Sequence, residues 1–188
     1  MPVRSFLGVS GRWGVNIMNW TEVLGMAELA DPPVPLLLGD EEWRGVARQL
    51  GITHVPMSYI DYFRAFGLGY WGDEMAVLSP VPSSAGDTVV SFFQQEWPQY
   101  SGREYCHLIP TVLLPGEVYL CWTPSEQNDA GEYALQIVDP GFARSQFIGY
   151  GLNEFFGTWW LGGKINTLGL LEGDWQTDLP FVPSNSER

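Results

Sequence analysis

Hydrophobic residues recur with helical spacing in four segments of the chain. The first predicted helix begins at Asp40, a good N-cap residue, and ends before Gly51, which suits the position after a helix. The second begins at Pro56 and ends at Gly67 and Gly69. A third is predicted over residues 88–97, and a fourth from residue 152 to the glycine pair 162–163. The apolar positions that define these helices are, in order, Trp43, Val46, Ala47 and Leu50; Tyr59, Tyr62, Phe63 and Phe66; Val90, Phe93 and Trp97; and Leu152, Phe155, Phe156 and Trp159.

Period-two alternation and β-branched residues predict strands in the middle of the chain. Residues 74–79 form a short strand that stops at Pro80, and residues 117–122 and 132–138 alternate between their two faces. The turn residues 128–131 between the last two predict that they pair as a hairpin. Residues 106–114 contain Pro110, which has no backbone N–H for a sheet ladder, so we expect an edge strand or two short pieces.

The order of these elements indicates the fold class and the domain limits. Strands cluster together instead of alternating with helices, which predicts a single α+β domain with helices packed around one antiparallel sheet. We expect this domain to span residues 40–171. Residues 1–39 are interpreted as an N-terminal arm with a proline-rich lead-in, and residues 172–188 as a frayed polar tail.

The chain is strongly acidic. Its 188 residues include 22 Asp and Glu against 9 Lys and Arg, a formal net charge of −13. A field of this sign repels phosphate groups, which argues against direct binding to nucleic acid and to anionic membranes. The charge serves either solubility or fast association with a basic partner. No apolar run has the length of a signal peptide or a membrane span, so we expect a cytoplasmic protein.

Few residues of the types that carry catalysis or bind metals are present. The two histidines, His54 and His107, lie in no zinc-binding pattern, and two cysteines, Cys106 and Cys121, are too few for a disulfide framework. On a strand, Cys106 and His107 would point to opposite faces, which argues against a thiolate–imidazole pair. Nucleophile-elbow and phosphate-loop motifs are absent from the sequence. We therefore expect no enzyme activity, no metal and no cofactor.

Four segments follow one another in an order that is typical of a known family. Residues 54–69 carry a proline, aromatic residues and a closing Gly-x-Gly; residues 75–80 are a core strand that stops at proline. Residues 116–122 are a Gly-Glu strand that ends in Trp122, and residues 150–162 supply a closing aromatic helix. In this order they resemble the SUKH superfamily, also called the SMI1/KNR4-like family, although Glu117 stands where Asp is usual.

This resemblance implies an α+β fold that binds proteins and carries no catalytic residues. Many bacterial members are immunity proteins that neutralise a cognate toxin, often a nuclease. We therefore expect an immunity protein whose acidic surface occludes a basic toxin domain. The alternatives are a regulatory interaction module of the same family and, third, an acidic carbohydrate hydrolase that uses paired carboxylates, either Asp73 with Glu74 or two of Glu126, Asp129 and Glu132.

Two segments are candidates for the partner-binding surface, because aromatic residues beside carboxylates are typical of binding hot spots. The loop after the second predicted helix offers Tyr70, Trp71, Asp73 and Glu74. The hairpin connection offers Trp122, Glu126 and Asp129. For Trp122, core packing is the stronger interpretation.

Overall fold

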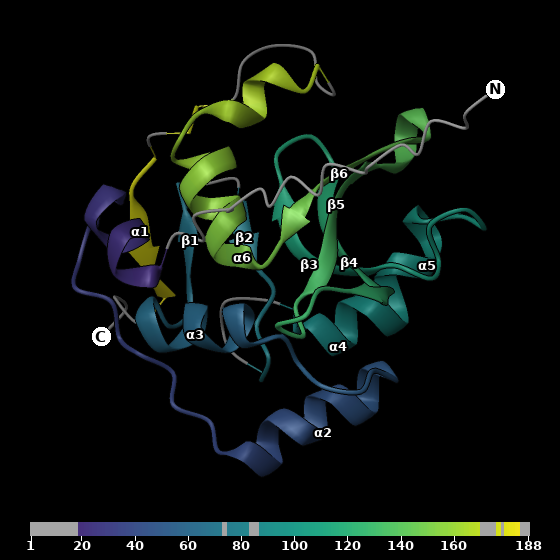
Figure 1. Cartoon of the computed structure of the whole chain (residues 1–188), viewed down its shortest axis with the longest axis horizontal. Helices are drawn as coiled ribbons and strands as arrows, with labels where there is room; N and C mark the ends of the chain where they lie inside the picture. The colour runs from purple at the N-terminus through teal and green to yellow at the C-terminus, as the bar shows by residue number, and fades with distance from the viewer. Residues whose placement is uncertain (1–18, 73–74, 83–86, 170–175, 178, 185–188) are drawn as a thin grey trace, which may run out of the picture.

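A seven-stranded antiparallel sheet forms the centre of the protein in the computed structural model (Figure 1). The structure describes residues 19–72, 75–82, 87–169, 176–177 and 179–184. The strands lie side by side in the order β6-β5-β4-β3-β2-β1-β7. Their bounds are β1 Gly69–Trp71, β2 Met75–Val77, β3 Ile109–Leu114, β4 Val118–Gln127, β5 Tyr133–Asp139, β6 Arg144–Tyr150 and β7 Phe181–Pro183. The predicted α+β class, with one antiparallel sheet and helices around it, is confirmed.

Helices cover both faces of this sheet. On one face, Tyr59 of α3 packs against Trp122 of β4, with ring centroids 5.0 Å apart. On the other face, Trp97 of α5 packs against Tyr119 at the same distance. Since Trp122 and Tyr119 are three residues apart on one strand, they point to opposite sides of the sheet. The helices are α1 Trp20–Met26, α2 Asp40–Leu50, α3 Met57–Ala65, α4 Val89–Ser91, α5 Trp97–Tyr100 and α6 Leu152–Glu154, with π-helical turns at Phe92–Glu96 and Phe155–Trp160 and 3₁₀ turns at Pro140–Phe142 and Lys164–Thr167.

The four predicted helices all form, with small differences at their ends. Gly39, and not Asp40, is the N-cap of α2, because the Glu42 carboxylate accepts a hydrogen bond from the Gly39 backbone N–H at 2.7 Å. The third predicted helix consists of α4, a π-helical turn and α5, and Thr88 caps its N-terminus. The fourth consists of α6 and a second π-helical turn.

The predicted hairpin forms, but the prediction for the segment that contains Pro110 is wrong. Strand β3 lies in the middle of the sheet between β2 and β4, whereas an edge strand or two pieces were expected. The register of β3 against β4 shifts between Pro110 and Val112. A β-bulge at this position accommodates a residue that cannot donate to the ladder, so proline is compatible with a central strand here.

Residues 19–39 and 179–184 contribute to the fold, which corrects the expectation of a loose arm and a frayed tail for these parts of the chain; the rest of the expected arm and most of the expected tail, residues 1–18, 172–175, 178 and 185–188, lie outside the described residues. Val23 of α1 and Phe181 of β7 are both fully buried. Strand β7 pairs with β1, and the backbone N–H of Phe181 donates to the carbonyl of Glu28 at 2.8 Å. Within the described segments, none of the helices has the length and apolar character required to cross a bilayer.

Candidate functional site

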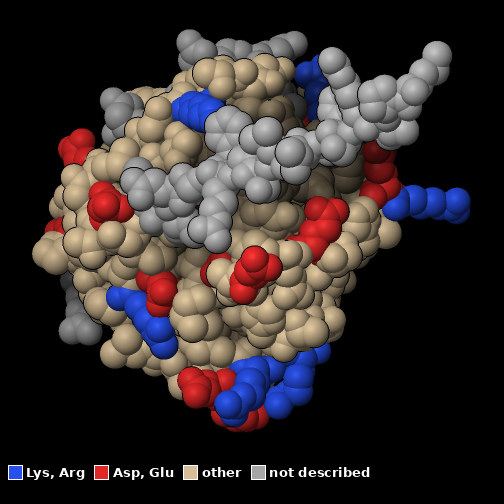
Figure 2. Space-filling view, in the orientation of Figure 1, with Lys and Arg blue, Asp and Glu red and all other residues tan. Residues whose placement is uncertain are grey.

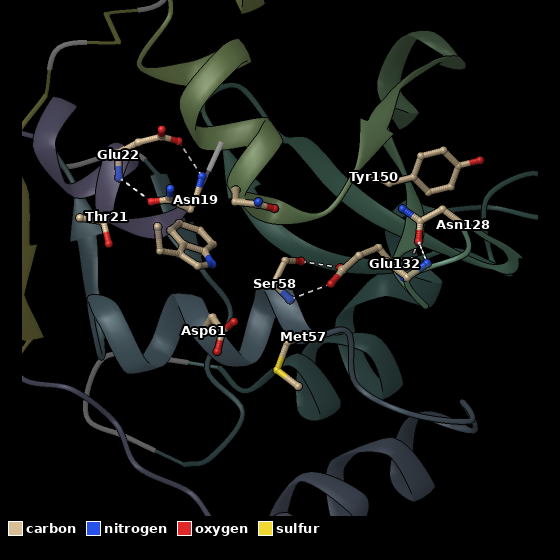
Figure 3. A pocket seen from close by; sticks show the side chains of 12 residues that line it. Asn19, Thr21, Glu22, Met57, Ser58, Asp61, Asn128, Glu132 and Tyr150 are labelled. Carbon is tan, nitrogen blue, oxygen red and sulfur yellow. Dashed lines mark hydrogen bonds between the residues drawn. The ribbon is translucent and has the colours of Figure 1, made fainter. Parts of the chain in front are cut away.

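A hollow of about 760 Å³ opens where α1, α3, the β4–β5 turn and the end of β6 meet (Figure 3). Helix α1 forms one wall, α3 forms the floor, and the turn together with Tyr150 forms the opposite wall. Each of the first three elements contributes one carboxylate. The lining residues are Asn19, Trp20, Thr21, Glu22, Met57, Ser58, Asp61, Asn128, Ala130, Glu132, Tyr150 and Asn153.

Glu132 caps the N-terminus of α3 from the other side of the hollow. Pro56 is the N-cap of this helix and supplies no side-chain hydrogen bond. The Glu132 carboxylate instead accepts hydrogen bonds from the Ser58 backbone N–H at 2.9 Å and from Ser58 Oγ at 2.6 Å. Ser58 Oγ also accepts from the backbone N–H of Leu152 at 2.9 Å. A carboxylate at this position satisfies open backbone donors and complements the helix dipole, so it ties the β4–β5 turn to α3.

The other two carboxylates of the hollow are held by local contacts. Glu22 and Asn19 form a capping box at the start of α1, in which each side chain accepts a hydrogen bond from the other residue's backbone N–H. Asp61 Oδ1 accepts a hydrogen bond from Nη1 of Arg64 at 3.0 Å. These contacts restrict the side chains before any partner arrives, which lowers the entropic cost of binding through them.

The β4–β5 turn is rigidly built. Asn128 Oδ1 accepts hydrogen bonds from the backbone N–H groups of Ala130 at 3.0 Å and Glu132 at 2.9 Å. The Nε2–H of His54 donates to the carbonyl of Gly131 at 2.7 Å. This histidine therefore anchors the turn to the segment before α3.

Negative charge is largely unbalanced on this protein. Six of the 22 carboxylates lie outside the described residues, and of the other 16 only those of Glu41 and Asp61 form ion pairs with described cations. Figure 2 shows acidic side chains scattered over the face that holds the hollow, whereas the largest group of basic side chains lies over α2. A basic partner that approaches the hollow thus meets Glu22 and Glu132, which form no ion pair with a described cation, whereas Asp61 is already paired with Arg64.

Two of the three predicted aromatic anchors, Trp71 and Trp122, lie in the core, and the third, Tyr70, is half-buried. Tyr70 and Trp71 belong to strand β1 and not to a loop, and Trp71 is fully buried, with Nε1–H donating to Tyr62 Oη at 3.2 Å. Trp122 is 1 % exposed and packs against Tyr59, in agreement with the core interpretation. Neither tryptophan is available to a partner at the surface.

The structure describes two of the four acidic residues that were predicted to contact a partner, Glu126 and Asp129. Asp73 and Glu74 lie outside the described residues, beyond β1. Glu126 near the end of β4 and Asp129 in the β4–β5 turn are exposed, and Asp129 is flanked by two residues that line the hollow. Strands β2 and β3 lie between β1, which holds Tyr70 and Trp71, and β4, which holds Trp122 and Glu126.

Glu22, Asp61 and Ser58 of the hollow were not predicted as site residues. The Asn-x-x-Glu spacing at residues 19–22 is a capping signal that the sequence does carry. The contact between Ser58 and Glu132 joins residues 74 positions apart, so no local pattern could indicate it.

The cysteines and histidines are not arranged as a reactive centre in the described structure. Cys106 and His107 precede β3 and are exposed, so the argument from opposite faces of a strand does not apply to them. Cys121 is buried, and its burial raises the pKa of the thiol well above the ordinary value, which disfavours the nucleophilic thiolate. Among the residues that the structure describes, no three His, Cys, Asp or Glu side chains are grouped so that they could hold a metal ion.

Comparison of the chain with models of known protein families found no match, and a search of curated proteins found no significant relative.

Proposed function

We propose that this protein is an immunity protein of the SUKH type, which binds a basic toxin domain, a nuclease in the first instance, and blocks it in the cytoplasm. The proposal rests chiefly on one observation, the hollow that combines the carboxylates of Glu22, Asp61 and Glu132 from three elements, beside the exposed Asp129 of the β4–β5 turn. A nuclease holds phosphate groups in a basic cleft, and a surface of fixed carboxylates is complementary to such a cleft.

Apolar groups beside these carboxylates support a protein partner. Trp20, Met57 and Tyr150 line the same hollow, and Met57 is 54 % exposed. Aromatic and methionine side chains are enriched at protein interfaces, where they supply contact area while charged groups provide steering. A lysine or arginine of the toxin would enter the hollow, and its aliphatic stem would lie along these apolar groups.

The proposal is tested with the product of the gene adjacent to the one that encodes this chain. We expect the two proteins to co-purify at low salt, and we expect nuclease activity of the partner to fall when this chain is added. Absence of binding at low salt would refute the proposed function, because an electrostatically steered complex is tightest there.

Two charge-matched double variants locate the surface. Glu126→Gln with Asp129→Asn removes two charges from the end of β4 and the β4–β5 turn, and Glu104→Gln with Glu117→Gln removes two charges elsewhere; all four residues are exposed. The first pair is expected to slow association and to weaken its salt dependence more than the second pair does. Equal effects would show that only the net charge matters and that the toxin binds another face.

A further inference from the structure

A second hollow, of about 480 Å³, lies between α2 and α3 and is lined in part by arginines, which pair with Glu41 and Asp61. We refer to it as the α2–α3 hollow. Three of its lining residues are arginines, namely Arg44, Arg48 and Arg64, and its one acidic lining residue is Asp40. The described part of the chain contains six Lys and Arg residues, so half of them gather at this site. Figure 2 shows basic side chains gathered over α2, next to acidic ones.

The floor of the α2–α3 hollow is apolar. Trp43 and Ala47 of α2, Val55 of the connecting segment and Ile60 of α3 line it, and all four are buried. The indole N–H of Trp43 is buried and has no hydrogen-bond partner among the described residues. A site with apolar walls, a few polar groups and a volume of several hundred cubic ångströms is typical of a pocket for a small ligand.

The arginines at the rim retain capacity for an anion. Arg44 and Arg48 both donate to the single carboxylate of Glu41, at 3.3 and 2.9 Å, and both are largely exposed. A guanidinium carries five N–H donors in a planar fork, so one shared carboxylate satisfies only a part of this pair. The two guanidiniums are also brought together by Glu41, whose pKa they lower.

We propose that the α2–α3 hollow binds a small organic anion, with an aromatic or aliphatic body on the apolar floor and one carboxylate at Arg44 and Arg48. This site adjoins the acidic hollow, because Met57 lines both and Arg64 pairs with Asp61, but it selects a ligand of the opposite charge and does not depend on the proposed toxin binding. Apolar burial supplies the affinity, and the bidentate arginine–carboxylate contact supplies the selectivity.

The test uses 2-naphthoate as the probe and 2-naphthylmethanol as its neutral counterpart with the same ring system. Binding is followed by NMR of protein labelled with ¹³C at the methionine methyl groups. Met57 lines the hollow and reports occupancy, while the fully buried Met75 of β2 is the internal reference. We expect saturable shifts of Met57 with naphthoate and about tenfold weaker binding of the alcohol, because one charge-assisted contact is lost.

Variants separate this site from general attraction of anions. Arg44→Gln with Arg48→Gln is expected to weaken naphthoate binding about tenfold or more, whereas the charge-matched pair Arg103→Gln with Arg144→Gln leaves it unchanged. Arg64 is left intact because its Nη1 lies 3.9 Å from the Met57 sulfur and its loss would shift the reporter directly.

One further variant gives an effect of opposite sign. Glu41→Gln removes the carboxylate that competes for both guanidiniums, so naphthoate should bind more tightly. Equal affinity for the charged and neutral probes, equal effects of the two arginine pairs, or no response of Met57 would each overturn the proposal. Thermal unfolding of every variant verifies that it is folded.

Discussion

The contact between Glu132 and Ser58 yields the most direct test of how the fold is held together. Replacement of Glu132 by Ala removes two hydrogen bonds to Ser58, at 2.9 and 2.6 Å, and the capping group of α3. Loss of a helix cap costs about 1 kcal/mol, and a hydrogen bond to a charged group contributes about 1.5–3 kcal/mol. Since the two effects overlap, we expect the free energy of unfolding to fall by about 2–3 kcal/mol.

This prediction is measured by urea unfolding followed by circular dichroism, with thermal unfolding as a second assay. For a chain of this size a loss of 2–3 kcal/mol corresponds to a decrease of about 4–12 °C in the melting temperature. Asp129→Ala is the matched control, because Asp129 is an exposed carboxylate in the same turn, and it should change stability by less than about 0.5 kcal/mol.

Glu132→Gln and a double-mutant cycle sharpen the result. The glutamine can accept one of the two hydrogen bonds, so its effect should lie between those of the wild type and Glu132→Ala. A cycle with Ser58→Ala should give a coupling energy of about 1 kcal/mol or more, because the two side chains are in direct contact. The capping role of Glu132 would be refuted if the Glu132→Ala and Asp129→Ala variants had the same free energy of unfolding.

Three further results are expected. Gly67→Ala should lower the free energy of unfolding by about 2 kcal/mol or more, because Gly67 has φ +70° and a Cβ there would collide with the backbone carbonyl of Val34. Gly51 also has φ +70° but lies in open space, so Gly51→Ala should lower it by only about 1 kcal/mol. Urea unfolding of the two variants tests this difference. The free energy of unfolding should fall as the pH rises above about 10. Tyrosine in the unfolded chain ionises near that pH, whereas burial is the main cause that raises the pKa of Tyr119 in the folded protein to about 12, so the native state holds the proton longer. A free energy of unfolding that does not change from pH 9 to 11 would contradict this. A thiol reagent should label Cys106 in the folded protein and Cys121 only after unfolding, and equal rates for the two would place Cys121 at the surface.

Locally encoded elements are the ones that sequence reasoning predicts well. Helices α2 and α3 carry a full apolar stripe, and the β4–β5 hairpin has alternation on both sides of a polar turn, so each pattern reflects burial of one face. Strands β1 and β7 have three residues each, which is too short to show a period. Their place in the sheet depends on pairing between residues more than a hundred positions apart.

The candidate site is less predictable for a related physical reason. An aromatic residue close to acidic residues in the sequence can belong either to a binding surface or to the core. Trp71 and Trp122 both have acidic residues nearby in the sequence, and both are buried in the core. Glu126 at the end of β4 and Asp129 in the β4–β5 turn were identified correctly as exposed, since carboxylates are rarely buried. The hollow itself arises from tertiary contacts between α1, α3 and the turn, and only its capping box has a local signal.

The position of β7 has a consequence for synthesis of the protein on the ribosome. Phe181 packs against Phe66 and Trp71, with ring centroids 5.2 and 5.4 Å apart, and β7 pairs directly with β1 on the side away from β2. A nascent chain that has not yet reached residue 181 therefore exposes an aromatic surface on α3 and β1, although more than 100 residues have already followed them. Translation adds about 5–20 residues per second, so this surface is open to chaperones for several seconds before the last strand covers it.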